Sequence, residues 1–465
     1  MSRKNPIPIS SSPPLPDLQQ SPGATSCTRR IGRCPEPSDE YNSSLPGSAP
    51  PIAENNGKLR SFCTRCDQTH PAEWHVKENR LFVRVECPEN SGDVLLTEDA
   101  ALFRELRRNH PAPKKPDARR FWSNHILLTE RCDCRCPVCY MDSGPDPDAP
   151  FLPVSTVLER AERVAKAGGA NAVLIGGEPA LHPDLVEIVR RIRSETGLKT
   201  ILATNGLRLA REPELLERLQ AARLGQLALQ FDTLEESTLR AIREHDRLAD
   251  KIAVARRCGD LGLELGLVCT VCPENLAELP DLVRWAMALP RLPKYLALQA
   301  MTPVGRHTDR PAPMTREVVI RSLTDAMPEL EIDHFWPVPP LPGLGIFVHP
   351  DCCSNAYLLR NGETLETVDR FLDMGRIISR MSEMKTDSRL PLLRALLAGI
   401  RWSCLPRNLP VLPAFRGGMM ILGVGDFHQP GFLNMDCLDR CATGVVTDDA
   451  IVPACRHYAE RMKSP

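Results

Sequence analysis

Residues 130–140 read ERCDCRCPVCY and hold four cysteines within eight positions, Cys132, Cys134, Cys136 and Cys139. The N-terminal stretch MSRKNPIPISSSPPLPDLQQ lacks the apolar run of a secretory signal, so we expect a cytoplasmic protein. In that compartment reducing thiol pools keep disulfides open, and a crowded set of thiols is seldom a disulfide framework. The loop therefore indicates metal or redox chemistry.

The charge balance limits the partners. The chain has 58 basic and 59 acidic residues, so no overall field favours nucleic acid. The most apolar stretch, GGMMILGVG from residue 417, is much shorter than the roughly 20 residues that a bilayer span requires. At 465 residues the chain is long enough for two or three domains.

Composition divides the chain into four parts. Residues 1–57 are rich in Pro, Ser and Gly and lack hydrophobic periodicity, so we expect a disordered tail in which Cys27 and Cys34 have no defined role. We expect a small metal-binding domain at 58–115, a barrel domain at 116–310 and a C-terminal domain at 311–465.

The small domain carries a Cys63-x-x-Cys66 knuckle, a predicted strand RLFVRVEC, and Cys87 at the end of that strand. Knuckles of this kind on hairpins commonly build tetrahedral metal sites, which predicts a rubredoxin-like or zinc-ribbon-like fold holding mononuclear iron or zinc. The alternative is a small β-hairpin with unligated thiols.

The fourth ligand of that site stays open. Asn90 stands where a second knuckle would carry Cys or His, which leaves His70 or His75 as substitutes.

From residue 123 to 305, apolar β-rich runs alternate with amphipathic helical stretches. The runs are HILLTE, NAVLIGG, KTILATNG, QLALQFDT, LGLVCTV and YLALQAMT. In the first helical stretch, STVLERAERVAKAGG, Thr156 and Glu159 fit a capping box. Six such units predict parallel strands with right-handed crossovers, too few for a full eight-stranded barrel. We therefore expect an α/β fold with a partial (β/α)6 barrel, whose active site lies at the carboxyl ends of the strands.

Residues with chemical potential follow the predicted strands. The four cysteines follow the first, the segment GGEP follows the second, TNG follows the third, and QFDT ends the fourth. Cys132, Cys136 and Cys139 form CxxxCxxC, and three thiolates suit three irons of a 4Fe–4S cube with one iron left open. A zinc site with Cys134 as fourth ligand is the alternative, although zinc favours two knuckles that lie far apart in sequence.

CxxxCxxC followed by GGEP on consecutive units resembles the radical S-adenosylmethionine (SAM) superfamily, over about residues 120–310. The resemblance implies that the open iron is chelated by SAM, that electron transfer from the reduced cluster cleaves SAM, and that a 5′-deoxyadenosyl radical abstracts a substrate hydrogen. Cys134 is then the thiol that does not ligate. A ferredoxin or flavodoxin is implied as the electron donor.

We expect the remaining strand-end residues to contact SAM. Gly176 and Gly177 would let the backbone approach its ammonium group, because neither has a Cβ. Glu178 would supply charge there or fix the turn. For Thr204 and Asn205 the alternative is an ordinary Asn-Gly turn. For Gln230 and Asp232 the alternative is a hydrogen bond to loop amides. The predicted SAM contacts are Gly176, Gly177, Glu178, Pro179, Thr204, Asn205, Gln230 and Asp232.

The C-terminal third carries further cysteines, which predict at least one auxiliary iron–sulfur cluster. Cys404, next to Trp402, is interpreted as a core residue. The predicted auxiliary ligands are Cys352, Cys437, Cys441 and Cys455.

The order of these parts resembles a narrower group that contains archaeal tetraether lipid synthase and the methanogen pterin methylase. The likeness extends to LALQFDTL, QAMTPVGRH and IVPACRHY, whereas the usual CPEHG of the first domain is CPENSG here. The first hypothesis is radical C–C bond formation or alkylation at an unactivated carbon of a lipid chain, which would imply peripheral membrane contact. The second is methyl transfer to a pterin-like small molecule, or peptide modification. The third is a non-catalytic iron–sulfur scaffold or sensor.

We expect the charged segment LEESTLRAIREHDRLADKIAVARRCGD to form a solvated face and not a docking site.

Overall fold

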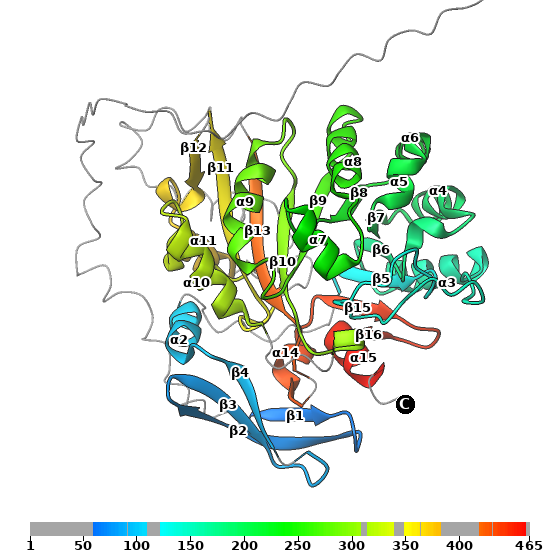
Figure 1. Ribbon diagram of the computed structural model, residues 1–465. Coiled ribbons are helices and arrows are strands. Elements are labelled where there is room, and N and C mark those ends of the chain that lie inside the picture. The colour runs from blue at the N-terminus through cyan, green and yellow to red at the C-terminus, as the bar shows by residue number, and fades with distance from the viewer. Residues whose placement is uncertain are drawn as a thin grey trace, which may run out of the picture. The chain divides into compact units, whose positions relative to one another are not determined.

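The computed structural model describes residues 59–90, 92–108, 121–307, 314–338, 348–362, 364–382, 418–429 and 431–461. The expected tail at 1–57 and the position of Cys404 lie outside these ranges. The described strands form two sheets, one of five strands and one of eleven (Figure 1).

Six parallel strands form the middle of the larger sheet, each beside the next in chain order. Every residue of the strand Asn171–Ile175 is buried, as expected for a strand covered on both faces. The six strands are β5 (Ser123–Leu127), β6 (Asn171–Ile175), β7 (Lys199–Thr204), β8 (Gln226–Gln230), β9 (Leu265–Val271) and β10 (Tyr295–Ala300).

Helices connect these strands and pack their apolar faces against the sheet. They are α3 (Val154–Lys166), α4 (Leu185–Thr196), α5 (Leu207–Arg211), α6 (Pro213–Ala221), α7 (Glu236–Arg243), α8 (Leu248–Asp260), α9 (Leu279–Ala288) and α10 (Arg316–Ala326). Short 3-10 turns also lie in the connections: η2 (Pro179–Leu181), η3 (Leu276–Glu278), η4 (Gly305–His307) and η5 (Ile332–His334).

The start of α3 differs from the prediction. The helix begins at Val154, Pro153 is its N-cap, and no side chain caps it. The predicted capping box at Thr156 and Glu159 is therefore wrong, because the fixed φ of proline starts the helix before Thr156.

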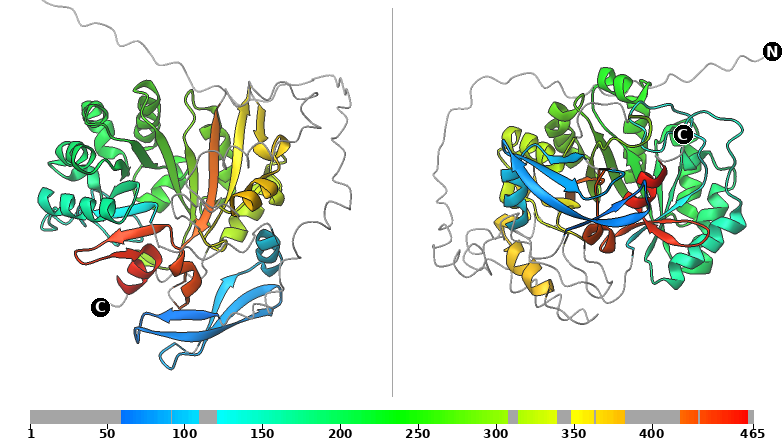
Figure 2. Two further views of the ribbon diagram at one scale, coloured as in Figure 1. Left: turned by 180° about the vertical axis from the view of Figure 1, so that it is seen from behind. Right: turned by 90° about the horizontal axis from the view of Figure 1, so that it is seen from below.

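The C-terminal segment extends the larger sheet at both edges. Strand β13 (Met419–Asp426) pairs parallel to β10, and β15 (Thr443–Val446) pairs parallel to β5. Figure 2 shows β13 beside the antiparallel strand β11 (Cys353–Asn361). The sheet is therefore mixed and larger than the predicted six strands, because segments distant in sequence complete both edges. The other elements here are β12 (Thr364–Thr367), η7 (Val368–Arg370), α11 (Met374–Ser382), β16 (Ile451–Pro453) and α15 (Ala454–Arg461).

The smaller sheet has the order β14-β1-β2-β3-β4. Its strands are β1 (Arg60–Cys63), β2 (Gln68–Lys77), β3 (Arg80–Val85), β4 (Asp93–Thr97) and β14 (Leu433–Asn434), flanked by α2 (Ala100–Arg108) and α14 (Met435–Asp439). Because β14 belongs to the C-terminal segment, residues after 311 contribute strands to both sheets.

In the described part of the chain, every helix is too short or too polar to cross a membrane.

Candidate functional site

Arg306 holds the cysteine loop in place. Its Nη1 donates to the Cys136 carbonyl (2.7 Å), Nη2 donates to the Ser143 carbonyl (2.6 Å), and its backbone N–H donates to the Cys139 carbonyl (2.9 Å). A Cβ on the preceding Gly305, whose φ is +71°, would lie 2.4 Å from the Cys139 carbonyl oxygen. The segment after β10 thus packs its backbone directly on the loop after β5.

The thiols of this loop lie close together. Cys132 and Cys134 are buried. The Cys134 thiol contacts the thiols of Cys132 and Cys136, each two residues away in sequence. These contacts, first with Cys132 and then with Cys136, raise the pKa of the Cys134 thiol far above its ordinary value. The bond from Cys134, helped by the Arg243 charge, lowers the pKa of Cys136 to about 6. Burial raises the pKa of Cys139.

Gly176 and Gly177 pack against the backbone that leads into the cysteine loop. A Cβ on Gly176 would lie 2.3 Å from the Thr129 carbonyl oxygen, and one on Gly177 would lie 2.3 Å from that of Arg131. The Gly177 N–H donates to Thr129 and the Glu178 N–H donates to Arg131, both at 2.8 Å. The absence of a Cβ is therefore required by this contact between two loops.

Glu178 is buried and accepts hydrogen bonds from residues that follow β6 and from residues at the end of β7. Its carboxylate accepts from the N–H of Ala180 (2.8 Å), the hydroxyl of Thr204 (2.6 Å) and the N–H of Asn205 (2.7 Å). Burial still raises its pKa to about 7. In this arrangement Glu178 fixes the turns after β6 and β7, the second of its two predicted roles. Pro179 follows as the first residue of η2.

Asn205 is also engaged within the protein. Its Nδ2 donates to Asp133 in the cysteine loop (2.7 Å), and its Oδ1 accepts from the Leu207 N–H (2.9 Å). Arg211 completes this contact with an ion pair to Asp133 (2.7 Å). The turn after β7 is thereby joined to the loop after β5.

Asp232 forms a buried bidentate pair with Arg243, with both N–O distances at 2.8 Å. The Asp232 carboxylate also accepts from the Thr270 N–H at 2.9 Å. Burial lowers the pKa of Arg243, but the charge and hydrogen bonds of Asp232 together with the nearby Cys136 outweigh it, so the pKa is raised. Asp232 thus positions a cation beside one of the predicted cluster thiols.

Lys251 joins the ends of β7 and β8. Its buried Nζ donates to the Asn205 carbonyl (2.7 Å), the Gln230 carbonyl (3.0 Å) and Gln230 Oε1 (2.7 Å). Burial lowers its pKa to about 8. Within the described residues, Gln230 Nε2 is buried without a hydrogen-bond partner, so this amide can still donate to a ligand.

Three of these residues escaped the sequence interpretation. Arg243 and Lys251 lie in the segment interpreted as a solvated face, yet only 7% and 1% of their surfaces are exposed. The interpretation is wrong for these two residues, whose charged groups bond to partners at the ends of β7 and β8. Other charged side chains of the segment, such as Glu236 and Arg240, are exposed as expected.

Arg306 is the third, and it lies in the segment QAMTPVGRH. The glycine before it, Gly305, was the available sign of a close approach between two loops.

The structure brings together two of the predicted auxiliary ligands and adds a histidine. Donor atoms of Cys352, His428 and Cys437 lie within 4.8 Å of one another. The contact with Cys437 lowers the pKa of Cys352, whereas burial raises that of Cys455 nearby. The Cys441 thiol donates to the Thr443 carbonyl at 3.1 Å. Cys352 and Cys437 fit a shared metal group, and the ligand roles of Cys441 and Cys455 stay predictions.

The thiols of Cys63, Cys66 and Cys87 in the smaller sheet also converge, within 4.8 Å of one another.

A pocket adjoins the auxiliary thiols at the carboxyl end of β13. Phe427, one of the aromatic residues that line it, contacts Tyr140, the residue after Cys139. The two ring centroids lie 6.0 Å apart. The pocket is thus connected to the cysteine loop by one ring pair. It is lined by Trp74, Leu96, Phe103, Arg316, Glu317, Asp351, Asp426, Phe427, His428, Gln429, Phe432, Asn434 and Cys437.

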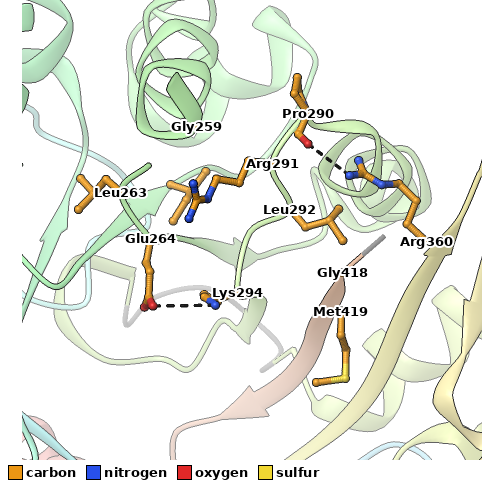
Figure 3. A pocket seen from close by; sticks show the side chains of 11 residues that line it. Gly259, Leu263, Glu264, Pro290, Arg291, Leu292, Lys294, Arg360, Gly418 and Met419 are labelled. Carbon is orange, nitrogen blue, oxygen red and sulfur yellow. Dashed lines mark hydrogen bonds and ion pairs between the residues drawn. The ribbon is translucent and has the colours of Figure 1, made fainter. Parts of the chain in front are cut away.

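A second cavity, of about 330 Å³, lies at the opposite, amino ends of β9, β10 and β13 (Figure 3). Glu264, Lys294 and Arg360 line it, and Arg360 donates to the Leu289 carbonyl at 2.5 Å. It is separate from the cysteine loop, which follows the carboxyl end of β5.

The donor set of the cysteine loop fits an iron–sulfur cluster with SAM. Three thiols lie on one partly buried loop, a cation lies beside Cys136, and the Gln230 amide is open to a ligand. The predicted SAM contacts of Gly176 to Asp232 stay predictions, since most of these groups bond within the protein here.

Residues 126–286 match the family profile described as Radical SAM superfamily. The human Molybdenum cofactor biosynthesis protein 1 is 35% identical over 184 residues, 38% of this chain and 27% of that protein. This chain thus spans about a quarter of that relative's length. A 7,8-dihydro-6-hydroxymethylpterin dimethyltransferase from Methanocaldococcus jannaschii is 23% identical over 371 residues, 70% of this chain and 72% of that one. The crystal structure of Streptococcus suis SuiB bound to S-adenosylmethionine has a TM-score of 0.40 and 15% identity, covering 55% of this chain and 68% of that one.

Proposed function

We propose that this chain, a radical SAM superfamily enzyme, alkylates a carbon of a pterin-like heteroaromatic small molecule. The observation that carries the proposal is the pocket lined by aromatic and carboxylate side chains, joined to the cysteine loop through Phe427 and Tyr140. The named activity of the methanogen relative, which aligns over most of both chains, supports the same substrate class.

Cys132, Cys136 and Cys139 would hold the 4Fe–4S cluster. When bound, the cluster and SAM supply one-electron chemistry that ends in hydrogen abstraction from the substrate. Arg306 fixes the loop that carries these thiols, and Arg243 favours the thiolate form of Cys136. A ferredoxin or flavodoxin is the proposed electron donor.

The pocket, about 50 Å³ in volume, is too small to enclose a two-ring pterin, but its carboxylates can accept from the pyrimidine edge of one. That edge presents adjacent N–H donors, and a carboxylate can accept two such bonds at once. Asp426 lies half-buried at the pocket and accepts one long bond, 3.4 Å, from the Arg316 N–H. Burial raises its pKa to about 7, so N–H donors from a substrate would stabilise its ionised form.

The same lining argues against a lipid chain as the substrate. The first hypothesis called for a long apolar groove beside the cysteine loop. The pocket that adjoins this loop instead carries four charged side chains: Arg316, Glu317, Asp351 and Asp426. Arg316 and Glu317 are buried as a pair. Asp351 and Asp426 are partly exposed, however, and covering their carboxylates with an alkyl chain would be unfavourable. We therefore propose alkylation at carbon with a polar ring as acceptor.

The test is anaerobic incubation of the full, reconstituted chain with SAM, a reduced flavodoxin and 6-hydroxymethyl-7,8-dihydropterin. Two SAM and two electrons from the flavodoxin would be consumed per product, one SAM as the source of the 5′-deoxyadenosyl radical and the other as the methyl donor. Mass spectrometry should therefore show 5′-deoxyadenosine, methionine, S-adenosylhomocysteine and a methylated pterin. Asp426→Asn should impair pterin alkylation by raising KM while SAM cleavage without substrate persists. Exposed Asp448→Asn is the matched control, and Cys136→Ala should abolish both products.

Cleavage of SAM without any modified pterin would reject the substrate class, whether the true acceptor is a lipid or a peptide. A reconstituted cluster that never yields 5′-deoxyadenosine would reject radical catalysis and favour the scaffold hypothesis.

A further inference from the structure

The cluster of three thiols in the smaller sheet has a histidine beside one of them, Cys66. Cys63 ends β1, Cys66 follows in the turn, and Cys87 follows β3. Their sulfur atoms lie within 4.8 Å of one another, and His70 Nε2 lies 3.1 Å from Cys66 Sγ. We propose that His70 is the fourth ligand and that this set holds a mononuclear zinc ion.

Strand geometry separates His70 from His75. Side chains alternate between the two faces of a strand, so His70, Ala72 and Trp74 share one face of β2 and His75 lies on the other. Ala72 and Trp74 pack in the same apolar cluster as Cys63 and Cys87. The face that carries His70 is therefore the face of the thiols.

His75 is committed elsewhere. Its ring stacks on Phe82 with centroids 5.5 Å apart, and its Nε2 lies 3.2 Å from Asp93 Oδ2. It could reach the thiols only by crossing the strand.

Asn90, at the usual position of a fourth ligand, has another role. Its Nδ2 donates to the Gly431 carbonyl at 2.7 Å. An amide is a poor ligand for zinc beside thiolates, and here it ties the Cys87 loop to the segment that precedes β14. The loss of a ligand at residue 90 is thus compensated by His70, which comes from β2.

The donor chemistry favours zinc. Three thiolates and one imidazole form a closed tetrahedral set of the kind that structural zinc sites use. Cys63 and Cys87 are almost fully buried, which leaves little room for a water or substrate ligand. The site also lies at the strand that pairs with β14, through Ser61 with Asn434 and Phe62 with Leu433. A zinc ion there would stabilise the pairing of β1 with β14, which is followed directly by α14 and Cys437.

The experiment is zinc K-edge absorption spectroscopy on the full chain purified anaerobically, so that the iron of the other clusters does not contribute. The wild type should show three Zn–S distances of roughly 2.3 Å and one Zn–N distance of roughly 2.0–2.1 Å, with imidazole scattering. His70→Asn should lose the imidazole signal and release zinc more than about 10-fold faster, since even outer partners of a metal site are worth that much.

His75→Asn is the matched control and should leave the spectrum and zinc content unchanged. His70→Cys should retain zinc with four sulfur ligands, which shows that the sheet tolerates a change at this position. A wild-type spectrum without imidazole scattering, equal losses in both histidine variants, or iron in place of zinc would each overturn the assignment. None of these readouts depends on the substrate, so the result is independent of the proposed activity.

Discussion

The guanidinium Nη1 of Arg306 donates a 2.7 Å hydrogen bond to the backbone carbonyl of Cys136, although 170 residues separate the two in sequence. This bond connects the last predicted strand end to the first. It makes the geometry of the cysteine loop depend on a residue that binds no metal.

We predict that Arg306→Lys lowers iron loading at the cysteine loop and slows SAM cleavage. A lysine keeps the charge but cannot reach the Cys136 and Ser143 carbonyls together, because it lacks the planar fork. Hydrogen bonds from a charged donor contribute about 1.5–3 kcal/mol each, so the loss should destabilise the loop by about 2 kcal/mol or more. Iron per chain and the paramagnetic signal of the reduced cluster measure the effect.

Arg240→Lys is the control, because Arg240 is an exposed arginine whose partner is Asp246. It should leave both readouts unchanged. Full iron loading and unimpaired cleavage in Arg306→Lys would show that the loop holds its shape without this clamp.

A second prediction concerns the buried pair of Asp232 and Arg243. Asp232→Asn should lower the free energy of unfolding by about 3–5 kcal/mol, because it leaves a buried guanidinium without its counter-charge. Urea unfolding of the apo chain under anaerobic conditions measures the change. Asp246→Asn removes an exposed pair near the same helix and should cost no more than about 1 kcal/mol. Equal effects of the two substitutions would contradict the assigned burial.

The sequence predicted the middle of the larger sheet well and its edges poorly. The strands β5 to β10 are short runs with apolar or alternating residues between amphipathic helices, and that local pattern is visible without any partner. The pairing of β13 with β10 and of β15 with β5 joins distant segments, and no local pattern states which edge such a strand joins.

The candidate site shows the same division. The thiols and the GGEP segment were recognisable because their spacing is specific. Lys251 was not, because a lysine on a charged helix gives no sign that its ammonium group will reach Gln230. His428 was not recognised either, because the two thiols close to it, those of Cys352 and Cys437, come from other segments of the chain.

A third prediction follows from the contact between Gly177 and Arg131. Gly177→Ala should destabilise the chain by about 1–3 kcal/mol and impair SAM cleavage, because the new methyl group would overlap the Arg131 carbonyl and push the cysteine loop away. Gly92→Ala is the control, since a Cβ there meets nothing within 4 Å. The measurements are urea unfolding and 5′-deoxyadenosine formation. Wild-type values for both in Gly177→Ala would show that the two loops can separate without cost.

The last prediction concerns Glu178 and pH. Burial raises the pKa of this carboxyl from 4.5 to about 7 in the folded chain. Between these values the folded state holds a proton that the unfolded state has released, so stability falls as pH rises. The shift corresponds to about 3 kcal/mol at most, present below pH 4.5 and lost as pH rises through about 7.

Glu178→Gln isolates this effect, because glutamine does not titrate. The variant loses one acceptor at every pH, so its free energy of unfolding should lie well below that of the wild type at pH 5. By pH 8 the difference in free energy of unfolding between the two chains should narrow by up to about 3 kcal/mol, since only the wild type then carries a buried charge at residue 178. Asp426, whose pKa is also raised to about 7, is present in both chains and cancels in the comparison. Urea unfolding at the two pH values, with exposed Glu187→Gln as the control, gives the difference directly. A gap that stays constant from pH 5 to pH 8 would mean that the three donors around Glu178 keep it ionised throughout.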